Sequence, residues 1–190
     1  MLKIGVFGGS FDPVHTEHIE IVKVAFKEFN IDKVIIVPAY TPPHKNFLNV
    51  SDTHRLNMLS CAIENLENVF INTFEINLKR VVYTYETLDY LKTKYSNANL
   101  KLIIGADSYN HLNTWKKSEY IAKEYGFLVI KRKNIAVDSN SKFFKYSQFS
   151  NFEGKFSSTQ VRENIKKGLD VSYILNDKVY NYIKENELYK

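Results

Sequence analysis

The chain has 190 residues, 44% of them hydrophobic and 25% charged, so it can bury a sizeable core. Its 13 phenylalanines and 13 tyrosines argue against a disordered protein. The single cysteine, Cys61, excludes an intrachain disulfide and a zinc site built on cysteines. No apolar run reaches the roughly 20 residues of a membrane-spanning helix. The N-terminal segment lacks the pattern of a signal peptide, so we expect a cytoplasmic protein.

The net charge of +5 is unevenly distributed along the chain. Residues 131–167 contain nine basic and three acidic side chains, whereas the rest of the chain is nearly neutral. A basic segment of this kind fits either a polyanionic partner such as nucleic acid or a pocket wall that attracts anionic substrates. We favour the pocket wall.

Short apolar runs alternate with longer segments of helical periodicity. We predict strands at 2–7, 33–37, 69–71, 100–104 and 127–130, and helices at 19–29, 51–66, 85–95, 109–125, after Ser158 and at 177–186. Buried strands separated by helices indicate an α/β protein with a doubly wound parallel sheet. We expect one domain over residues 1–190, in which residues 157–190 form a small C-terminal helical part.

The loop after the first predicted strand is the most informative stretch. Gly8 and Gly9 allow the backbone to approach a ligand closely, and the N-terminus of the helix that follows attracts anions. His15 and His18 are three residues apart, which places both on one face of the first helical turn. Two imidazoles at a helix start can stabilise charge on a phosphate during its transfer. A purely structural pair of histidines is the competing interpretation.

Motifs of several other enzyme classes are absent. No Gly-x-Gly-x-x-Gly follows the first strand, and the sequence contains no P-loop. The Gly-x-Ser-x-Gly elbow of hydrolases is also missing. These absences exclude the dinucleotide-binding, P-loop and serine-hydrolase types of active site.

Residues 8–18 resemble the Gly-Gly-Ser-Phe-Asp-Pro-x-His-x-Gly-His signature of nucleotidylyltransferases. Four later segments resemble, in order, motifs of the bacterial nicotinate-mononucleotide adenylyltransferase family: 37–45, 83–88, 105–115 and 157–162. One such motif alone is weak evidence, but five in the same order over essentially the whole chain are strong. The resemblance implies the Rossmann-like nucleotidylyltransferase fold.

The resemblance also implies an activity, in which AMP is transferred from ATP to nicotinate mononucleotide, giving deamido-NAD and pyrophosphate in NAD biosynthesis. Its implied partners are these two nucleotides, with no nucleic acid and no membrane, and self-association is left open. Mg²⁺ would be held mainly by the ATP phosphates. The residue chemistry agrees, because a phosphate acceptor is already an anionic nucleophile and needs positioning rather than a general base.

Roles are carried over to the matching residues only. His15 and His18 would hold the ATP phosphates and stabilise the developing charge. The residues implied to bind ATP and its phosphates are Gly8, Gly9, Ser10, Phe11, Lys45, Gly105, Asp107, Ser158, Thr159 and Arg162. Those implied to line the nicotinate pocket are Thr84, Tyr85 and Trp115, and no side chain is implied as a metal ligand. Taken alone, Ser157-Ser158-Thr159 fits a helix cap and Trp115 fits a helix packed in the core.

The sequence departs from the family pattern at several places. Glu17 replaces the glycine between the two histidines, and we expect its side chain to point outward because it does not share their helical face. An outward Glu17 predicts that glycine at this position would maintain the use of ATP. Val82 replaces a serine, and residues 131–133 lack the usual Arg-Pro-Gly.

These departures keep two alternatives open. The same transfer could use nicotinamide mononucleotide or another phosphorylated acceptor such as phosphopantetheine. The chain could also be a nucleotide- or RNA-binding module without activity.

Overall fold

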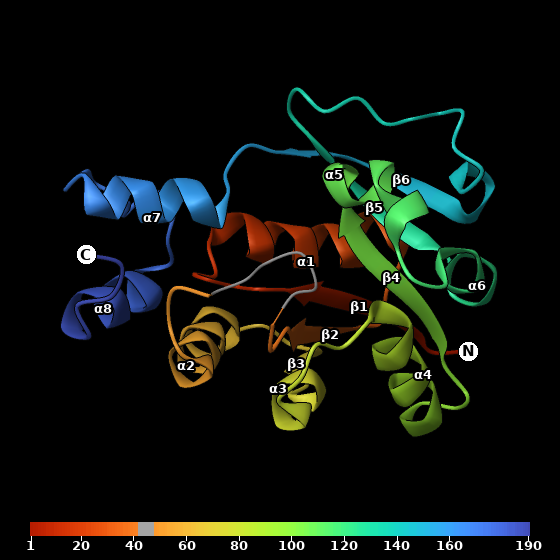
Figure 1. Cartoon of the computed structure of the whole chain (residues 1–190), viewed down its shortest axis with the longest axis horizontal. Coiled ribbons are helices and arrows are strands. Elements are labelled where there is room, and N and C mark those ends of the chain that lie inside the picture. Colours follow the sequence, from red (N-terminus) through yellow and green to blue (C-terminus); the bar gives the residue numbers. More distant parts are fainter. Residues whose placement is uncertain (42–47) are drawn as a thin grey trace.

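The structure is a computed structural model that describes residues 1–41 and 48–190. Within these residues, six parallel strands form one sheet in the order β3-β2-β1-β4-β5-β6 (Figure 1). The strands are β1 (Lys3–Gly9), β2 (Lys33–Pro38), β3 (Val69–Ile71), β4 (Asn99–Gly105), β5 (Phe127–Arg132) and β6 (Ser147–Gly154). The predicted doubly wound α/β fold is therefore confirmed.

Helices cover both faces of the sheet. They are α1 (Thr16–Phe29), α2 (Asp52–Ile63), α3 (Phe74–Leu78), α4 (Thr84–Lys94), α5 (Ala106–Asn110), α6 (Ser118–Glu124), α7 (Ser158–Lys166) and α8 (Asp177–Glu185), with short 3-10 turns η1 (Leu112–Thr114) and η2 (Phe144–Tyr146). Alternate strand residues face opposite sides. Val34 and Ile36 of β2 share a core with α1, α2 and α8, whereas Ile35 and Val37 share one with α4 and α6.

The predicted helix over 109–125 is wrong, because the chain there is broken into α5, η1 and α6. The Thr114 hydroxyl donates to the carbonyl of His111 (2.8 Å), and such side-chain bonds compete with helical ones. Trp115 is extended (φ −81°, ψ 139°) and Lys117 adopts a left-handed conformation (φ 55°). Trp115 therefore lies in a turn rather than on the helix that we expected.

Apart from the short 3-10 turns, two elements were not predicted, the short helix α3 and the strand β6. The sequence of β6, Ser-Gln-Phe-Ser-Asn-Phe-Glu-Gly, has no continuous apolar run because the strand lies at the edge of the sheet. It pairs with β5 through a register shift between Val129 and Lys131, where the Ser150 hydroxyl accepts from the Lys131 amide (3.0 Å). β6 thus returns the chain to the carboxyl end of β5.

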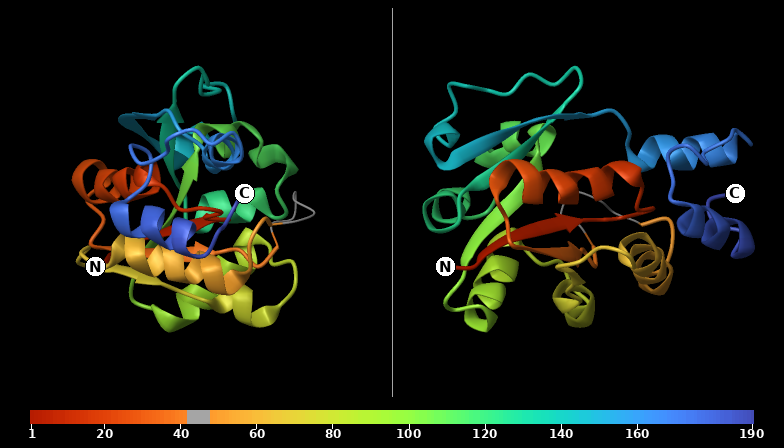
Figure 2. Two further views of the ribbon diagram at one scale, coloured as in Figure 1. Left: turned by 90° about the vertical axis from the view of Figure 1, so that its left-hand side faces the viewer. Right: turned by 180° about the vertical axis from the view of Figure 1, so that it is seen from behind.

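The two predicted C-terminal helices are present, as α7 and α8. They lie at the end of the molecule toward which β1 runs (Figure 1), and α8 packs beside α2 (Figure 2). The Tyr182 hydroxyl on α8 contacts His54 Nδ1 (3.0 Å) and accepts from Asn57 Nδ2 (2.9 Å) on α2. No helix in the described residues is long and apolar enough to cross a membrane.

Candidate active site

A cavity of about 600 Å³ opens at the carboxyl ends of the strands. The connections leave β1 and β4 toward opposite sides of the sheet, and an open α/β sheet binds its ligands in the crevice at this switch point. The ends of β1 and β4 and the starts of α1, α4 and α7 contribute to the wall. The described residues that were predicted for the site and line this cavity are Gly8, Gly9, Ser10, Phe11, His15, His18, Thr84, Gly105, Asp107, Trp115, Ser158 and Thr159.

Hydrogen bonds to buried polar side chains fix the loop between β1 and α1. Arg55 is fully buried and donates from Nη1 to the Ser10 carbonyl (2.8 Å). The Asp12 carboxylate accepts from the Asn49 amide (2.9 Å) and from the Tyr189 hydroxyl (2.8 Å). These bonds fix the loop and tie the C-terminal tail to it. Sequence reasoning missed Arg55, because only the fold brings it beneath the loop.

The ring of Phe11 packs against the ring of His18. Its ring centroid is 5.0 Å from that of His18, and a Cβ at Gly9 would lie only 3.0 Å from the Phe11 ring. Glycine at this position therefore allows the strand end and the aromatic ring to pack closely.

The two histidines form a compact pair at the start of α1. The His15 amide donates to His18 Nδ1 (3.1 Å), and the two ring centroids are 3.8 Å apart. Burial lowers the pKa of His15 to about 3, and the positive charge of Arg132 adds to this effect. Burial, then His15 and Arg132, hold the pKa of His18 well below its ordinary value. Both rings are consequently neutral at pH 7.

The buried Nδ1 of His15 has no hydrogen-bond partner in the part of the chain that the structure describes. A buried polar atom of this kind costs free energy until a partner arrives. A phosphate oxygen of a bound nucleotide could supply that partner.

Asp107 and Arg132 face each other at the β4 and β5 side of the cavity. Arg132 Nε lies 3.4 Å from Asp107 Oδ1, and both residues line the cavity. A Cβ at Gly105 would overlap Asp107 Oδ1 and would lie 3.3 Å from Arg132 Nε. Glycine is therefore required at 105 if this ion pair is to keep its place. Sequence reasoning missed Arg132, although its position at the carboxyl end of a parallel strand was a usable signal.

The start of α7 is fastened to the loop that precedes α1. Ser157 caps the helix by accepting from the Gln160 amide (3.3 Å), so the helix-cap interpretation holds for this residue. The Ser158 hydroxyl donates to the Pro13 carbonyl (2.9 Å), and Arg162 Nη1 donates to the Asp12 carbonyl (2.6 Å). Arg162 does not line the cavity. Its expected phosphate contact stays a prediction.

Residues of α4 and of the turn after η1 form another part of the wall. Thr84 and Trp115 both line it, but Tyr85 does not. The Tyr85 ring instead lies under the Lys117 ammonium, at 4.1 Å from ring centroid to Nζ. Lys116 lines the cavity as well.

Glu75, which sequence reasoning also missed, lies in the same wall. Its Oε1 accepts from the Thr87 hydroxyl (2.6 Å), and burial raises the pKa of the Glu75 carboxyl to about 7. The shift arises mainly from removing the carboxylate from water, with a smaller contribution from the charge of Glu86.

A family model described as cytidylyltransferase-like matches residues 6–164. A protein of Endomicrobium trichonymphae named "probable nicotinate-nucleotide adenylyltransferase" is 40% identical over 193 residues, which cover all of both chains. The chain belongs to this adenylyltransferase family. A relative of the same name from Clostridium botulinum is 36% identical, again over the whole of both chains.

Solved structures show the same family fold. The nicotinic acid mononucleotide adenylyltransferase of Plasmodium falciparum, complexed with NaAD, matches with a TM-score of 0.83 at 22% identity. The match covers 100% of this chain and 98% of that one. The corresponding structure complexed with APC has a TM-score of 0.81 at 20% identity and covers the same shares of the two chains.

Glu17, where this family member departs from the signature, does not point outward as we expected. Its side chain is buried (8% exposed), lines the cavity, and accepts from the Lys155 amide through Oε1. The expectation failed because β6 was not predicted. That strand delivers Lys155 to the side of α1 that the helical pattern alone left to solvent.

The basic segment contributes less to the cavity of this adenylyltransferase than its charge suggested. Of its nine basic residues, Arg132 alone lines the cavity described here. Lys142 instead pairs with Glu119 (2.5 Å) on the surface. Lys45 falls at 42–47, outside the described residues, so its expected role stays a prediction.

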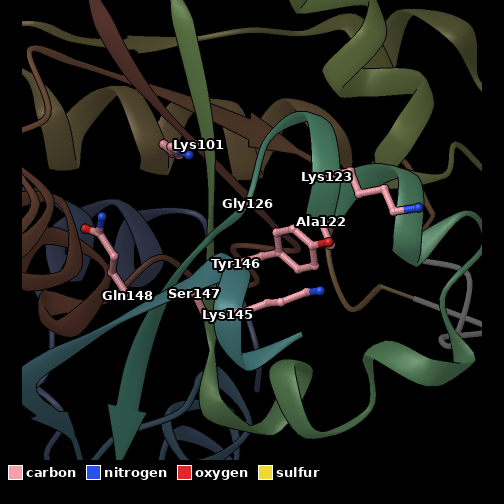
Figure 3. Close-up of a pocket in the computed structure, with 8 residues that line it drawn as sticks. All are labelled: Lys101, Ala122, Lys123, Gly126, Lys145, Tyr146, Ser147 and Gln148. Carbon is pink, nitrogen blue, oxygen red and sulfur yellow. The ribbon is translucent and has the colours of Figure 1, made fainter. Parts of the chain in front are cut away.

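A smaller hollow of about 250 Å³ lies beside β4, α6, η2 and β6, and Lys101, Lys123 and Lys145 are among the residues that line it. Figure 3 shows the Lys101 side chain set apart from those of Lys123 and Lys145. The three ammonium groups therefore do not converge on one point, and we assign no ligand to this hollow.

Proposed function

We propose that this protein transfers AMP from ATP to nicotinate mononucleotide, forming deamido-NAD and pyrophosphate in NAD biosynthesis. The observation that carries the proposal is the neutral His15–His18 pair at the start of α1, inside a cavity at the switch point of the sheet. The full-length relatives named for this activity support it.

The transfer needs positioning and charge stabilisation rather than a base. The phosphate of the mononucleotide attacks the α-phosphate of ATP, the bond to the β-phosphate breaks, and pyrophosphate leaves. His15 and His18 donate hydrogen bonds to phosphate oxygens, on which negative charge develops. Because His15 is buried and His18 is partly buried, their dipoles act in a region of low dielectric and stabilise this charge strongly. An anion bound beside them also raises the pKa of both imidazoles.

The remaining site residues take places along the cavity. Three segments surround the phosphates: the end of β1 with Gly8 and Gly9, the following loop with Ser10 and Phe11, and the start of α7 with Ser158 and Thr159. Gly105 and Asp107 contact the adenosine. Thr84 and Trp115 bind the nicotinate ring, which Trp115 covers by stacking. For Lys45, Arg162 and Tyr85 the proposed roles rest on the family resemblance.

Mg²⁺ enters as the ATP complex in this proposal, held mainly by phosphate oxygens, and supplies positive charge to the triphosphate. The three carboxylates that line the cavity are engaged elsewhere, since Asp107 pairs with Arg132, Glu17 accepts from the Lys155 amide and Glu75 accepts from the Thr87 hydroxyl. The residues present therefore fit a metal that the substrate carries.

The test is pyrophosphate release from ATP and Mg²⁺ with nicotinate mononucleotide, nicotinamide mononucleotide or phosphopantetheine supplied in turn. We expect kcat/KM for the nicotinate form to exceed that for each other acceptor by at least about tenfold, since the loss of a matched polar contact costs roughly that much. Comparable turnover of the nicotinamide form would contradict acid specificity. Tight ATP binding without turnover of any acceptor would favour a binding module.

A further inference from the structure

Glu17 is a buried carboxylate in the active cavity that the transfer reaction does not use. It lies on the first turn of α1, between the two histidines. A charge buried here loses its hydration, which is costly unless a partner compensates. It also repels the triphosphate that the same cavity is proposed to bind. The free energy that offsets these two costs must therefore come from the contacts that Glu17 makes within the protein.

Those contacts join two segments that are far apart in the sequence. Glu17 Oε1 accepts from the backbone amide of Lys155, which lies 138 positions later, in the connection between β6 and α7. The neighbouring residue, Gly154, is the last of β6, and a Cβ there would lie 2.9 Å from Glu17 Oε2. The carboxylate occupies the space that a side chain at 154 would need.

The connection held by Glu17 leads directly into the start of α7. Ser157 is the N-cap of α7, two residues after Lys155, and Ser158 and Thr159 follow it in the cavity wall. The bonds of Ser158 and Arg162 fasten α7 to the loop before α1. The Glu17 bond fastens the chain entering α7 to α1 itself.

We propose that Glu17 is a positioning residue that, with Gly154 leaving room for it, fixes the start of α7 relative to the His15–His18 pair. This inference rests on the proposed function, in which the start of α7 binds the ATP phosphates. Glu17 then aligns the phosphate-binding wall with the histidines. The other wall, with Thr84 and Trp115, belongs to different elements and does not depend on this bond.

The proposal predicts an asymmetric effect on the two substrates. Glu17→Ala removes the acceptor for the Lys155 amide, and we expect KM for ATP to rise about tenfold, as for the loss of a hydrogen bond to a charged group. KM for nicotinate mononucleotide should stay within about twofold of wild type, because its wall is intact. Glu17→Gln is the matched control. Its amide oxygen still accepts from Lys155, so it should restore most of the affinity for ATP.

A double-mutant cycle with Gly154→Ala tests the pairing. The added methyl group needs the position of Glu17 Oε2, so Gly154→Ala alone should displace the carboxylate and raise KM for ATP as Glu17→Ala does. Once residue 17 is alanine, the methyl group has room, since the next side-chain atom, on the Phe152 ring, is 3.9 Å away. The double variant should then resemble Glu17→Ala alone.

Three results would overturn the proposal. The first is wild-type KM for ATP in Glu17→Ala or Glu17→Gly, and the second is an equal rise of both KM values. The third is a double variant in which the rise of KM for ATP equals the product of the rises in the two single variants. If the wild-type protein turns over no mononucleotide, the proposed function fails. The affinity for ATP, measured by calorimetry in the wild type, the two single variants of the cycle and the double variant, still tests the positioning role. Thermal unfolding of each variant serves as the control for folding.

Discussion

Replacing His15 with asparagine should make the folding stability less sensitive to acid. The imidazole of His15 is 5% exposed, and burial lowers its pKa from an ordinary 6.5 to about 3. The folded state therefore keeps this ring neutral at a pH where the unfolded chain protonates it. Asparagine has no titrating group, so the variant loses this source of pH dependence.

The magnitude follows from the two pKa values. The stability contributed by neutral His15 is fully present above pH 6.5 and is lost as the pH falls toward 3, because the unfolded state then binds the extra proton. At pH 5, roughly 1.5 pH units below the unfolded value, the loss amounts to about 2 kcal/mol relative to pH 7.5.

The assay is urea unfolding of both proteins at pH 7.5 and pH 5, followed by circular dichroism without nucleotide. We expect the free energy of unfolding of the wild type to fall by about 2 kcal/mol more than that of His15→Asn. Titrating groups away from His15 act equally in both proteins and cancel in this comparison. His18 is the exception, because His15 helps to lower its pKa; removing His15 eases that shift and enlarges the expected difference. An equal fall in both would refute the conclusion that His15 is neutral because it is buried.

Three further substitutions test other parts of the site. His18→Ala should lower kcat by two to three orders of magnitude, roughly the cost of losing one donor to developing charge. The variant should still be folded at the assay temperature, because the lost bond from the His15 amide costs only about 1 kcal/mol; a small change in kcat would remove His18 from the proposed role. Gly105→Ala should displace Asp107 from Arg132 and raise KM for ATP several-fold in initial-rate assays, and an unchanged KM would show that this contact is dispensable. Glu75→Gln should unfold at a higher urea concentration than the wild type at pH 8 but not at pH 4.5. The difference in the free energy of unfolding should reach up to about 3 kcal/mol, because the raised pKa of Glu75 costs the wild type stability as the pH rises from 4.5 to about 7. A parallel pH dependence of the two proteins would contradict the burial of Glu75.

Much of the fold could be predicted because its central strands are buried on both faces. The runs that form β1, β2 and β5 are continuously apolar, and the run that forms β4 is interrupted only by Lys101; such runs are distinctive in a sequence. The edge strand β6 is polar on its exposed face, so no local pattern reveals it. The helical break at Trp115 and Lys117 arises from a hydrogen bond made by the Thr114 hydroxyl and from the non-helical backbone of these two residues. Hydrophobic periodicity does not reveal either feature.

The candidate site divides in a similar way. The residues of the β1–α1 loop are neighbours in sequence, so their spacing alone predicted that His15 and His18 share one turn. Glu17, Glu75 and Arg132 acquire their environments from segments that meet only in the folded chain. The outward orientation predicted for Glu17 failed for this reason, since its partner lies on a connection that follows an unpredicted strand.

The central claim is that the reaction transfers an adenylyl group, and the most direct test follows the label from ATP labelled at its α-phosphate. With nicotinate mononucleotide and Mg²⁺, the account predicts that this label appears in deamido-NAD, while label at the γ-phosphate is released in pyrophosphate. Transfer of the γ-label to the mononucleotide would contradict the account, and so would an α-label that never leaves ATP.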